Sequence, residues 1–273
     1  MLAISALSDE TAHNLLGVFT DIDDTLTTDG RLHAAAYAAL ERLERCGLAV
    51  VPITGRPAGW CDMIARFWPV AGVIGENGAF YFSYDRATRK MMRRFMAGED
   101  ERRENRERLA DLASAILAAV PGSAVSADQL YRETDLAIDY CEDVSPLPDR
   151  SVDKIVALFK AEGAVAKVSS IHVNGWFGAY DKLVMSRRFA AEVLDVDLDA
   201  DESRFIFCGD SPNDAPMFKF FSNACGVANV HKYAGRITSN PTYVTKAQAG
   251  EGFVELADHL VRARASFVPA AKG

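Results

Sequence analysis

Short apolar runs that end in polar turns alternate with helix-forming segments through the first third of the chain. The apolar runs span 16–20, 48–53 and 70–74, and a segment rich in Ala, Leu, Glu and Arg spans 33–45. A further helix is expected after Pro57. Strands that alternate with helices favour a parallel sheet with right-handed crossovers, which predicts an α/β fold. In such sheets ligands bind beyond the carboxyl ends of the strands, and the polar turns of this chain fall there.

The middle of the chain breaks this alternation and predicts a second, smaller sheet. A charge-rich run at 91–120 is typical of a solvated helix face. It is followed by candidate strands and a helix at 136–142, 150–161, 165–171 and 174–179. The parallel pattern then resumes with a helix and two strands, at 182–194, 204–208 and 223–228. We therefore expect a core formed by residues 1–83 and 179–273, with an α/β module inserted at 84–178.

The charge and the cysteines exclude several classes of protein. The formal net charge is −8, whereas nucleic-acid-binding proteins usually carry a basic surplus. No apolar stretch approaches the roughly 20 residues of a membrane-spanning helix, and the N-terminal residues lack the basic region of a secretory signal. The 5 cysteines are scattered and form no CxxC pair, which argues against a disulfide framework or a zinc site. We expect a cytoplasmic protein with reduced thiols that binds neither nucleic acid nor membranes; the sequence leaves its oligomeric state open.

The strongest local signal is the run Asp21-Ile22-Asp23-Asp24-Thr25, which directly follows a buried strand. Clustered carboxylates repel one another unless a cation lies between them, and Mg²⁺ prefers a few carboxylates together with water and phosphate oxygens. A calcium loop of the EF-hand type is excluded, because its Gly and Glu positions are Leu26 and Leu32 here. An acidic turn that caps the next helix remains an alternative.

Three further groups fall at comparable places. Gly209-Asp210-Ser211-Pro212-Asn213-Asp214 follows the strand at 204–208, Thr54 ends the second strand within an ITGR turn, and Lys182 begins a helix. Each has a plain structural explanation, because Ser, Thr, Asn and Asp are common helix caps and a single Lys is usually solvated. Their order along the chain is more informative than any one of them.

In this order, the four groups resemble the motifs of the haloacid dehalogenase superfamily of phosphohydrolases. The first resembles the DxDxT signature, and the last resembles the GDxxxD signature. The inserted module resembles the large α/β cap of one subgroup, which includes sugar-phosphate phosphatases and phosphomannomutases, and Glu76-Asn77-Gly78 resembles a segment common there. The chain departs from the subgroup at Lys182-Leu183, where Lys-Gly is frequent, and Lys167 in the cap is a rival for that position.

The resemblance implies a Rossmann-like core, a cap, and a Mg²⁺-dependent phosphatase that acts on a small phosphorylated substrate, with sugar phosphates as the expected class. Asp21 would be the nucleophile and Asp23 the general acid and base. Mg²⁺ would be held by Asp21, the backbone carbonyl of Asp23 and Asp210, with Asp214 orienting its water ligands. The transferring phosphate would be bound by Thr54, Gly55 and Lys182.

The cap is expected to select the substrate. Alternation along the strand near 170–176 places Ser170, His172, Asn174 and Trp176 on one face. A polar face with an aromatic ring suits a polyol, although a solvent-facing sheet surface gives the same pattern. Two other functions stay open at this point, a phosphomutase of the same architecture and a non-catalytic binding module. The second predicts a lost nucleophile, whereas Asp21 is present.

Overall fold

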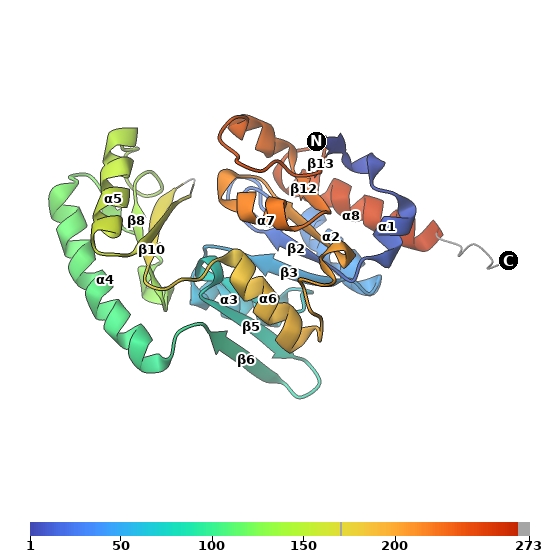
Figure 1. Ribbon diagram of the computed structural model, residues 1–273, viewed down its shortest axis with the longest axis horizontal. Coiled ribbons are helices and arrows are strands. Elements are labelled where there is room, and N and C mark those ends of the chain that lie inside the picture. The colour runs from blue at the N-terminus through green and yellow to red at the C-terminus, as the bar shows by residue number, and fades with distance from the viewer. Residues whose placement is uncertain (170, 267–273) are drawn as a thin grey trace.

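The computed structural model describes residues 1–169 and 171–266, and it has two lobes (Figure 1). Ser170, one of the candidates on the cap strand, lies outside the described residues. The larger lobe is built on a nine-stranded sheet. In spatial order its strands are β1 (Leu2–Ala3), β13 (Tyr243–Val244), β12 (Ala224–Gly226), β11 (Phe205–Gly209), β2 (Gly17–Asp21), β3 (Ala49–Ile53), β4 (Val73–Gly75), β5 (Phe80–Asp85) and β6 (Lys90–Phe95). In this spatial order, every pair of neighbouring strands from β1 across to β4 is parallel. Strands β5 and β6 add an antiparallel hairpin at the β4 edge.

Helices cover both faces of this sheet, because its central strands are apolar on both sides. Val18 of β2 faces the cluster that includes residues of α1, α2 and α8, whereas the next residue, Phe19, faces the cluster that includes residues of α6 and α7. The helices of this lobe are α1 (Asp9–Asn14), α2 (Ala34–Arg45), α3 (Ala58–Phe67), α6 (Lys182–Val193), α7 (Ala215–Phe220) and α8 (Ala249–Ser266). The α/β fold expected from the sequence is therefore observed. No helix among the described residues is long and apolar enough to cross a membrane.

The smaller lobe has its own four-stranded antiparallel sheet, in the order β7 (Ala124–Val125), β8 (Asp135–Asp139), β10 (His172–Trp176) and β9 (Val165–Val168). Its two helices, α4 (Glu99–Ala119) and α5 (Asp149–Ala161), pack on one face of this sheet around Ile116, Ile138, Phe159 and Val173. On the other face of this sheet, His172 and Asn174 of β10 line a cavity between the smaller and the larger lobe. We call the smaller lobe the cap and the larger one the core.

The first division between core and cap differs from the one expected from the sequence. The expected division at residue 84 falls inside β5, and β6 pairs with β5 along its whole length. The run at 91–96 is rich in Met and Arg, which are good helix formers. This composition favours a single helix from residue 91 onward, whereas the charge-rich helix begins at Glu99. We propose to divide core from cap at 96–98 and at 177–181.

Candidate active site

Three neighbouring strands carry the polar groups that the sequence singled out. β2 lies between β3 and β11 in the sheet, with Asp21 opposite Ile53 and Thr20 opposite Cys208. Asp21 is the last residue of β2, Thr54 follows β3, and Asp210 follows β11. Because parallel strands end at the same edge of a sheet, these side chains meet there. The convergence of distant segments that the four motifs predicted is therefore present.

Lys182 joins this group from the first turn of α6. Its Nζ lies 2.6 Å from Asp21 Oδ1 and 2.9 Å from Asp214 Oδ1, and all three residues are buried. Asp181 caps the helix by accepting a hydrogen bond from the backbone N–H of Val184, which fixes the start of α6 at this point. The two carboxylates raise the pKa of Lys182, although burial alone lowers it. The departure at Leu183 thus does not displace the lysine from the predicted place.

Asp214 is held by three donors. Besides Lys182, the backbone N–H groups of Asp210 and Ser211 donate to its Oδ2 at 3.1 and 3.3 Å. This arrangement requires glycine at position 209, since a Cβ there would lie 2.6 Å from Asp214 Oδ2. Asp214 therefore shapes the turn that carries Asp210, with its carboxylate already occupied by protein donors.

The chemistry of the acidic groups fits a divalent cation. One carboxylate oxygen from each of Asp21, Asp210 and Asp214 lies within 4.8 Å of the others. Burial raises the pKa of Asp21 to about 7, with contributions from Asp214 and Asp23, although Lys182 acts in the opposite direction. Burial, followed by the carboxylates of Asp214, Asp21 and Asp24, raises the pKa of Asp210 to about 9. One lysine cannot neutralise three buried carboxylates, so a hard cation with oxygen ligands would stabilise the ionised group.

Asp23 has a partner that the sequence analysis missed. Arg56 holds its carboxylate through two nitrogens, with Nε 3.0 Å and Nη2 2.8 Å from Oδ1. The guanidinium also lies over the Trp60 ring, 4.7 Å from its centroid, and 3.9 Å from Glu142 of the cap. Only the Thr and Gly of the ITGR turn were considered from the sequence, yet its Arg lies one residue beyond them and faces the same edge of the sheet.

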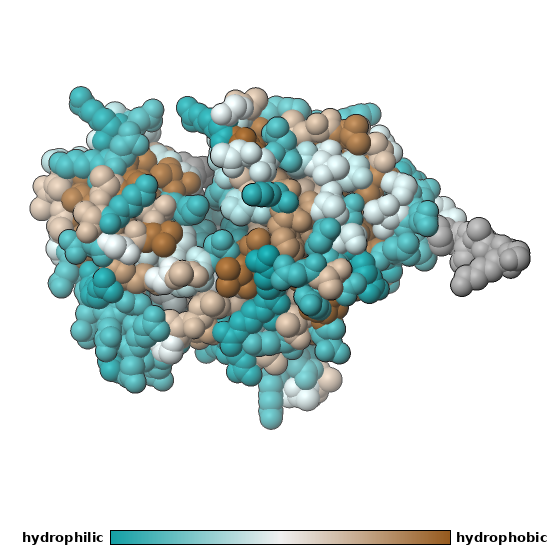
Figure 2. All heavy atoms as spheres, in the orientation of Figure 1, coloured by the Kyte–Doolittle hydropathy of each residue, from teal (hydrophilic) through white to brown (hydrophobic). Residues whose placement is uncertain are grey.

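A cavity of about 500 Å³ lies between core and cap, beneath the notch that separates the two lobes in Figure 2. Its volume suits a small metabolite. From the core it is lined by Asp21, Asp23, Gly55, Arg56 and Asp210, and from the cap by Arg132, Lys167, His172 and Asn174, among others. Thr54 and Lys182 do not line this cavity; Thr54 is buried, and its Oγ1 accepts a hydrogen bond from the backbone N–H of Arg56.

The cap candidates divide into two groups. His172 and Asn174 line the cavity and are 3% and 4% exposed, so their strand face is not a solvent-facing surface. Trp176 is 1% exposed and stacks on Tyr180, with ring centroids 5.8 Å apart. It lines a second cavity of about 40 Å³ together with Lys182. The alternation along β10 placed Trp176 on the correct face, but at the end of the strand that packs on the core.

Comparison with known proteins gives the same assignment as the motifs. No protein-family model matches the chain. A phosphoglycolate phosphatase of Methanospirillum hungatei is 28% identical over 257 residues, which cover 89% of this chain and 95% of the relative. The solved structure of a haloacid dehalogenase-like hydrolase from Bacteroides thetaiotaomicron has a TM-score of 0.64 at 14% identity and covers 90% of this chain and 99% of that chain. The sucrose-phosphatase of Synechocystis, solved with sucrose and phosphate, has a TM-score of 0.61 at 16% identity and covers 90% and 97%.

The chain is a phosphatase with the haloacid dehalogenase fold. The curated relatives confirm the class of phosphoric monoester hydrolase that the motifs implied, and the solved structures confirm the fold. Two residues that matter to the geometry of this phosphatase, Arg56 and Arg132, were not singled out from the sequence.

Proposed function

We propose that the protein is a Mg²⁺-dependent phosphatase that hydrolyses a small phosphorylated metabolite through an aspartyl-phosphate at Asp21. One observation carries the proposal. Asp21, Asp210, Asp214 and Lys182 meet at the carboxyl edge of the sheet, and two of these carboxylates, Asp21 and Asp210, face the cavity between core and cap. Four charged groups buried in one place cost stability, and a phosphoryl-transfer site gives each of them a use.

The protein's side chains divide the reaction into two steps. Asp21 attacks phosphorus in line and forms the acyl phosphate, while the bond to the leaving oxygen breaks. Asp23 gives its proton to that oxygen, and then takes a proton from the water that attacks phosphorus and restores Asp21. Arg56 fixes the carboxylate of Asp23 in place. The Oγ1 of Thr54 accepts from the backbone N–H of Arg56, so its hydroxyl hydrogen can point to a phosphate oxygen. The N–H of Gly55 and the charge of Lys182 complete the binding of phosphate.

We propose that Mg²⁺ is held by Asp21, Asp210 and the backbone carbonyl of Asp23. When bound, it supplies positive charge that neutralises the phosphate and the clustered carboxylates. Asp214 already accepts three hydrogen bonds from the protein, and beside a bound ion it would orient water ligands rather than bind the ion directly.

Sugar phosphates remain the substrate class that we propose. The cap wall of the cavity offers the polar side chains of His172, Asn174 and Lys167 to a leaving group with hydroxyls. Phosphoglycolate is a second candidate, favoured by the names of the curated relatives. The Lys167 ammonium on the cap wall suits its carboxylate. A phosphomutase would return the phosphoryl group to the substrate rather than to water, and no contact among the described residues favours it.

The first experiment is a panel of sugar phosphates and 2-phosphoglycolate, assayed for release of inorganic phosphate. We expect turnover with Mg²⁺ and its loss in excess chelator, with recovery when Mg²⁺ is restored. Release of phosphate without any added bisphosphate separates a phosphatase from a mutase. A panel that gives no phosphate with Mg²⁺, from a folded protein, would remove the proposed function.

Replacing Arg56 with Lys tests the positioning of Asp23. Lysine keeps the charge but cannot hold the carboxylate through two nitrogens. We expect kcat to fall about tenfold or more, because proton transfer by a well-placed group contributes about 10²- to 10⁴-fold, while KM changes little. Arg66→Lys, on the helix α3 that follows this turn, is the matched control, since Arg66 pairs with Asp62 away from the cavity. A kcat equal to that of the control would show that Arg56 does not position Asp23.

A further inference from the structure

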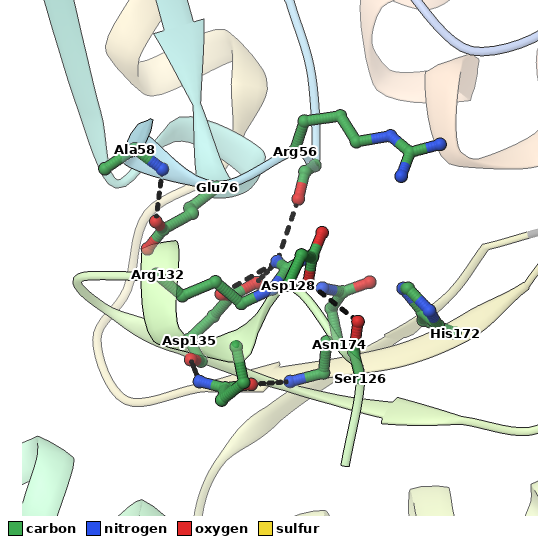
Figure 3. Close-up of polar contacts among 12 residues, drawn as sticks. Arg56, Ala58, Glu76, Ser126, Asp128, Arg132, Asp135, His172 and Asn174 are labelled. Atoms are coloured by element: carbon green, nitrogen blue, oxygen red, sulfur yellow. Dashed lines mark hydrogen bonds and ion pairs between the residues drawn. The ribbon is translucent and has the colours of Figure 1, made fainter. Parts of the chain in front are cut away.

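A buried carboxylate of the core is bound mainly by the cap. Glu76 follows β4 and is 0% exposed. Its Oε1 accepts from the backbone N–H of Ala58 at 3.0 Å and of Glu133 at 2.9 Å, and its Oε2 accepts from the N–H of Thr134 at 2.7 Å and from the Thr134 hydroxyl. Burial and the nearby Asp135 raise the pKa of Glu76 to about 7. The Thr134 hydroxyl, the N–H of Glu133 and the charge of Arg132 oppose that rise by favouring the ionised form. Figure 3 shows the contact of Glu76 with Ala58 at the start of α3. Through Glu133 and Thr134, Glu76 ties this point to the cap segment that enters β8.

An arginine of the cap makes the reciprocal contact. The Arg132 side chain is 1% exposed. Its guanidinium binds Asp128 through Nε at 2.9 Å and Nη2 at 3.1 Å, and Asp135 through Nη1 at 3.0 Å. The same Nη1 donates to the backbone carbonyl of Gly55, 3.0 Å away in the core (Figure 3). A buried charge with so many partners holds one geometry, because any other would leave charges unpaired.

Gly55 belongs to the turn on which the proposed chemistry depends. Thr54 and Arg56 flank it, and Arg56 holds Asp23. The core side of this turn is fixed as well, since the N–H of Glu76 donates to the carbonyl of Arg56 at 3.2 Å and the N–H of Asn77 donates to that of Thr54 at 3.0 Å. The carbonyl between these two, that of Gly55, is the one bound by the cap.

The same group reaches the opposite wall of the cavity. Asp135 accepts from Asn174 Nδ2 at 2.9 Å, and Asn174 lines the cavity on β10. Ser126 donates to Asp128 at 2.7 Å and steadies the second partner of Arg132. One connected set of hydrogen bonds therefore runs from the Thr54–Arg56 turn through Arg132 to the substrate wall of the cap (Figure 3).

We propose that Arg132 is a positioning residue, which together with Glu76 forms a fixed joint between core and cap and holds the Thr54–Arg56 turn in the orientation that catalysis requires. This role rests on the proposed function, because the turn is assigned there to phosphate and to Asp23. Because segment 128–135 is bound to the core at this joint, the cap wall that carries Asn174 keeps a fixed position relative to the Thr54–Arg56 turn.

The kinetic test uses Arg132→Lys, which keeps the charge but loses the forked contacts with Asp128 and the reach to Gly55. We expect kcat to fall at least about tenfold on the best substrate of the panel, because small misplacements of catalytic groups cost up to about 10²-fold. The effect should fall on kcat more than on KM. Arg106→Lys is the matched control. Arg106 contacts the same 128–135 segment, since it donates to the backbone carbonyl of Glu133, but it does so from the exposed side of the cap. A kcat equal to that of the control overturns the proposal.

Hydrogen exchange tests the joint without any substrate. In Arg132→Lys, the amides of Thr54, Gly55, Arg56 and Ala58 should exchange faster than in the parent protein and in Arg106→Lys, while peptides of β2 and β11 stay unchanged. If Arg132→Lys does not fold, Asp128→Asn is the second variant. It removes the charge of the partly exposed partner of Arg132, and exchange of the same amides should become faster. Unchanged exchange at 54–58 in the folded variant overturns the joint. Because this readout needs no turnover, failure of the joint and failure of the proposed function are distinguished.

Discussion

Replacing Asp21 with Asn should abolish turnover while the chain remains folded. The amide keeps the shape of the carboxylate but is not a nucleophile, and we expect kcat to fall by about 10⁴-fold or more, as for other nucleophiles that form covalent intermediates. The fold should persist, because Asp21 is one of three buried carboxylates that share a single lysine, and Lys182 keeps its contact with Asp214. Loss of one negative charge lowers the repulsion within this group.

Phosphate release and thermal unfolding, measured on the same preparations, test this expectation. Asp29→Asn is the matched control, since Asp29 lies in the loop that follows, is exposed, and has a positive φ of 49° that Asn tolerates well. We expect the control to retain the activity of the parent protein. Near-normal turnover in Asp21→Asn would exclude Asp21 as the nucleophile.

Replacing Lys182 with Met should remove both activity and much of the stability. Lys182 is the cation that contacts Asp21 and Asp214, and its removal leaves two buried carboxylates without their ion-pair partner. Breaking a buried pair in this way costs about 3–5 kcal/mol. Phosphate binding also loses a charge beside the nucleophile, so turnover should become undetectable or nearly so.

The measurement is urea unfolding in the presence of chelator, so that a bound cation does not replace the missing charge. Lys219→Met, in the last turn of α7, removes an exposed lysine and should change the free energy of unfolding by no more than about 0.5 kcal/mol. Equal unfolding free energies for the two variants would show that the ion pairs of Lys182 contribute nothing to the fold.

Much of the core could be predicted from local patterns. An apolar run followed directly by carboxylates, as at 16–23, needs a strand that is buried along its length and a polar edge where it ends, and β2 with Asp21 has this arrangement. The hairpin of β5 and β6 was not anticipated, because β6 is an edge strand with mostly exposed side chains. Its Met and Arg residues carry no strand signal, and only pairing with β5 makes them a strand.

The candidate site could be predicted less completely than the fold. Asp21, Lys182 and Asp210 could be predicted because the sequence around each one marks the end of a strand or the start of a helix. Arg132 has no such signal, and Glu76 follows a predicted strand but was assigned no role. Their partners at Gly55 and Thr134 are distant in the sequence and belong to the other lobe. A pattern within one strand or helix predicts which face a residue occupies, but not which residue of another domain meets it.

The phosphoenzyme itself provides the most direct test of the assignment of Asp21. The Mg²⁺-loaded protein is mixed with its best substrate, quenched in acid within the first turnover, and reduced with borohydride, which converts an aspartyl phosphate to homoserine. Peptide mass spectrometry then locates the product. We predict homoserine at position 21 in samples quenched during turnover, and unmodified Asp21 when substrate is omitted. Turnover without homoserine at position 21, or with the modification at another residue, would contradict covalent catalysis by Asp21.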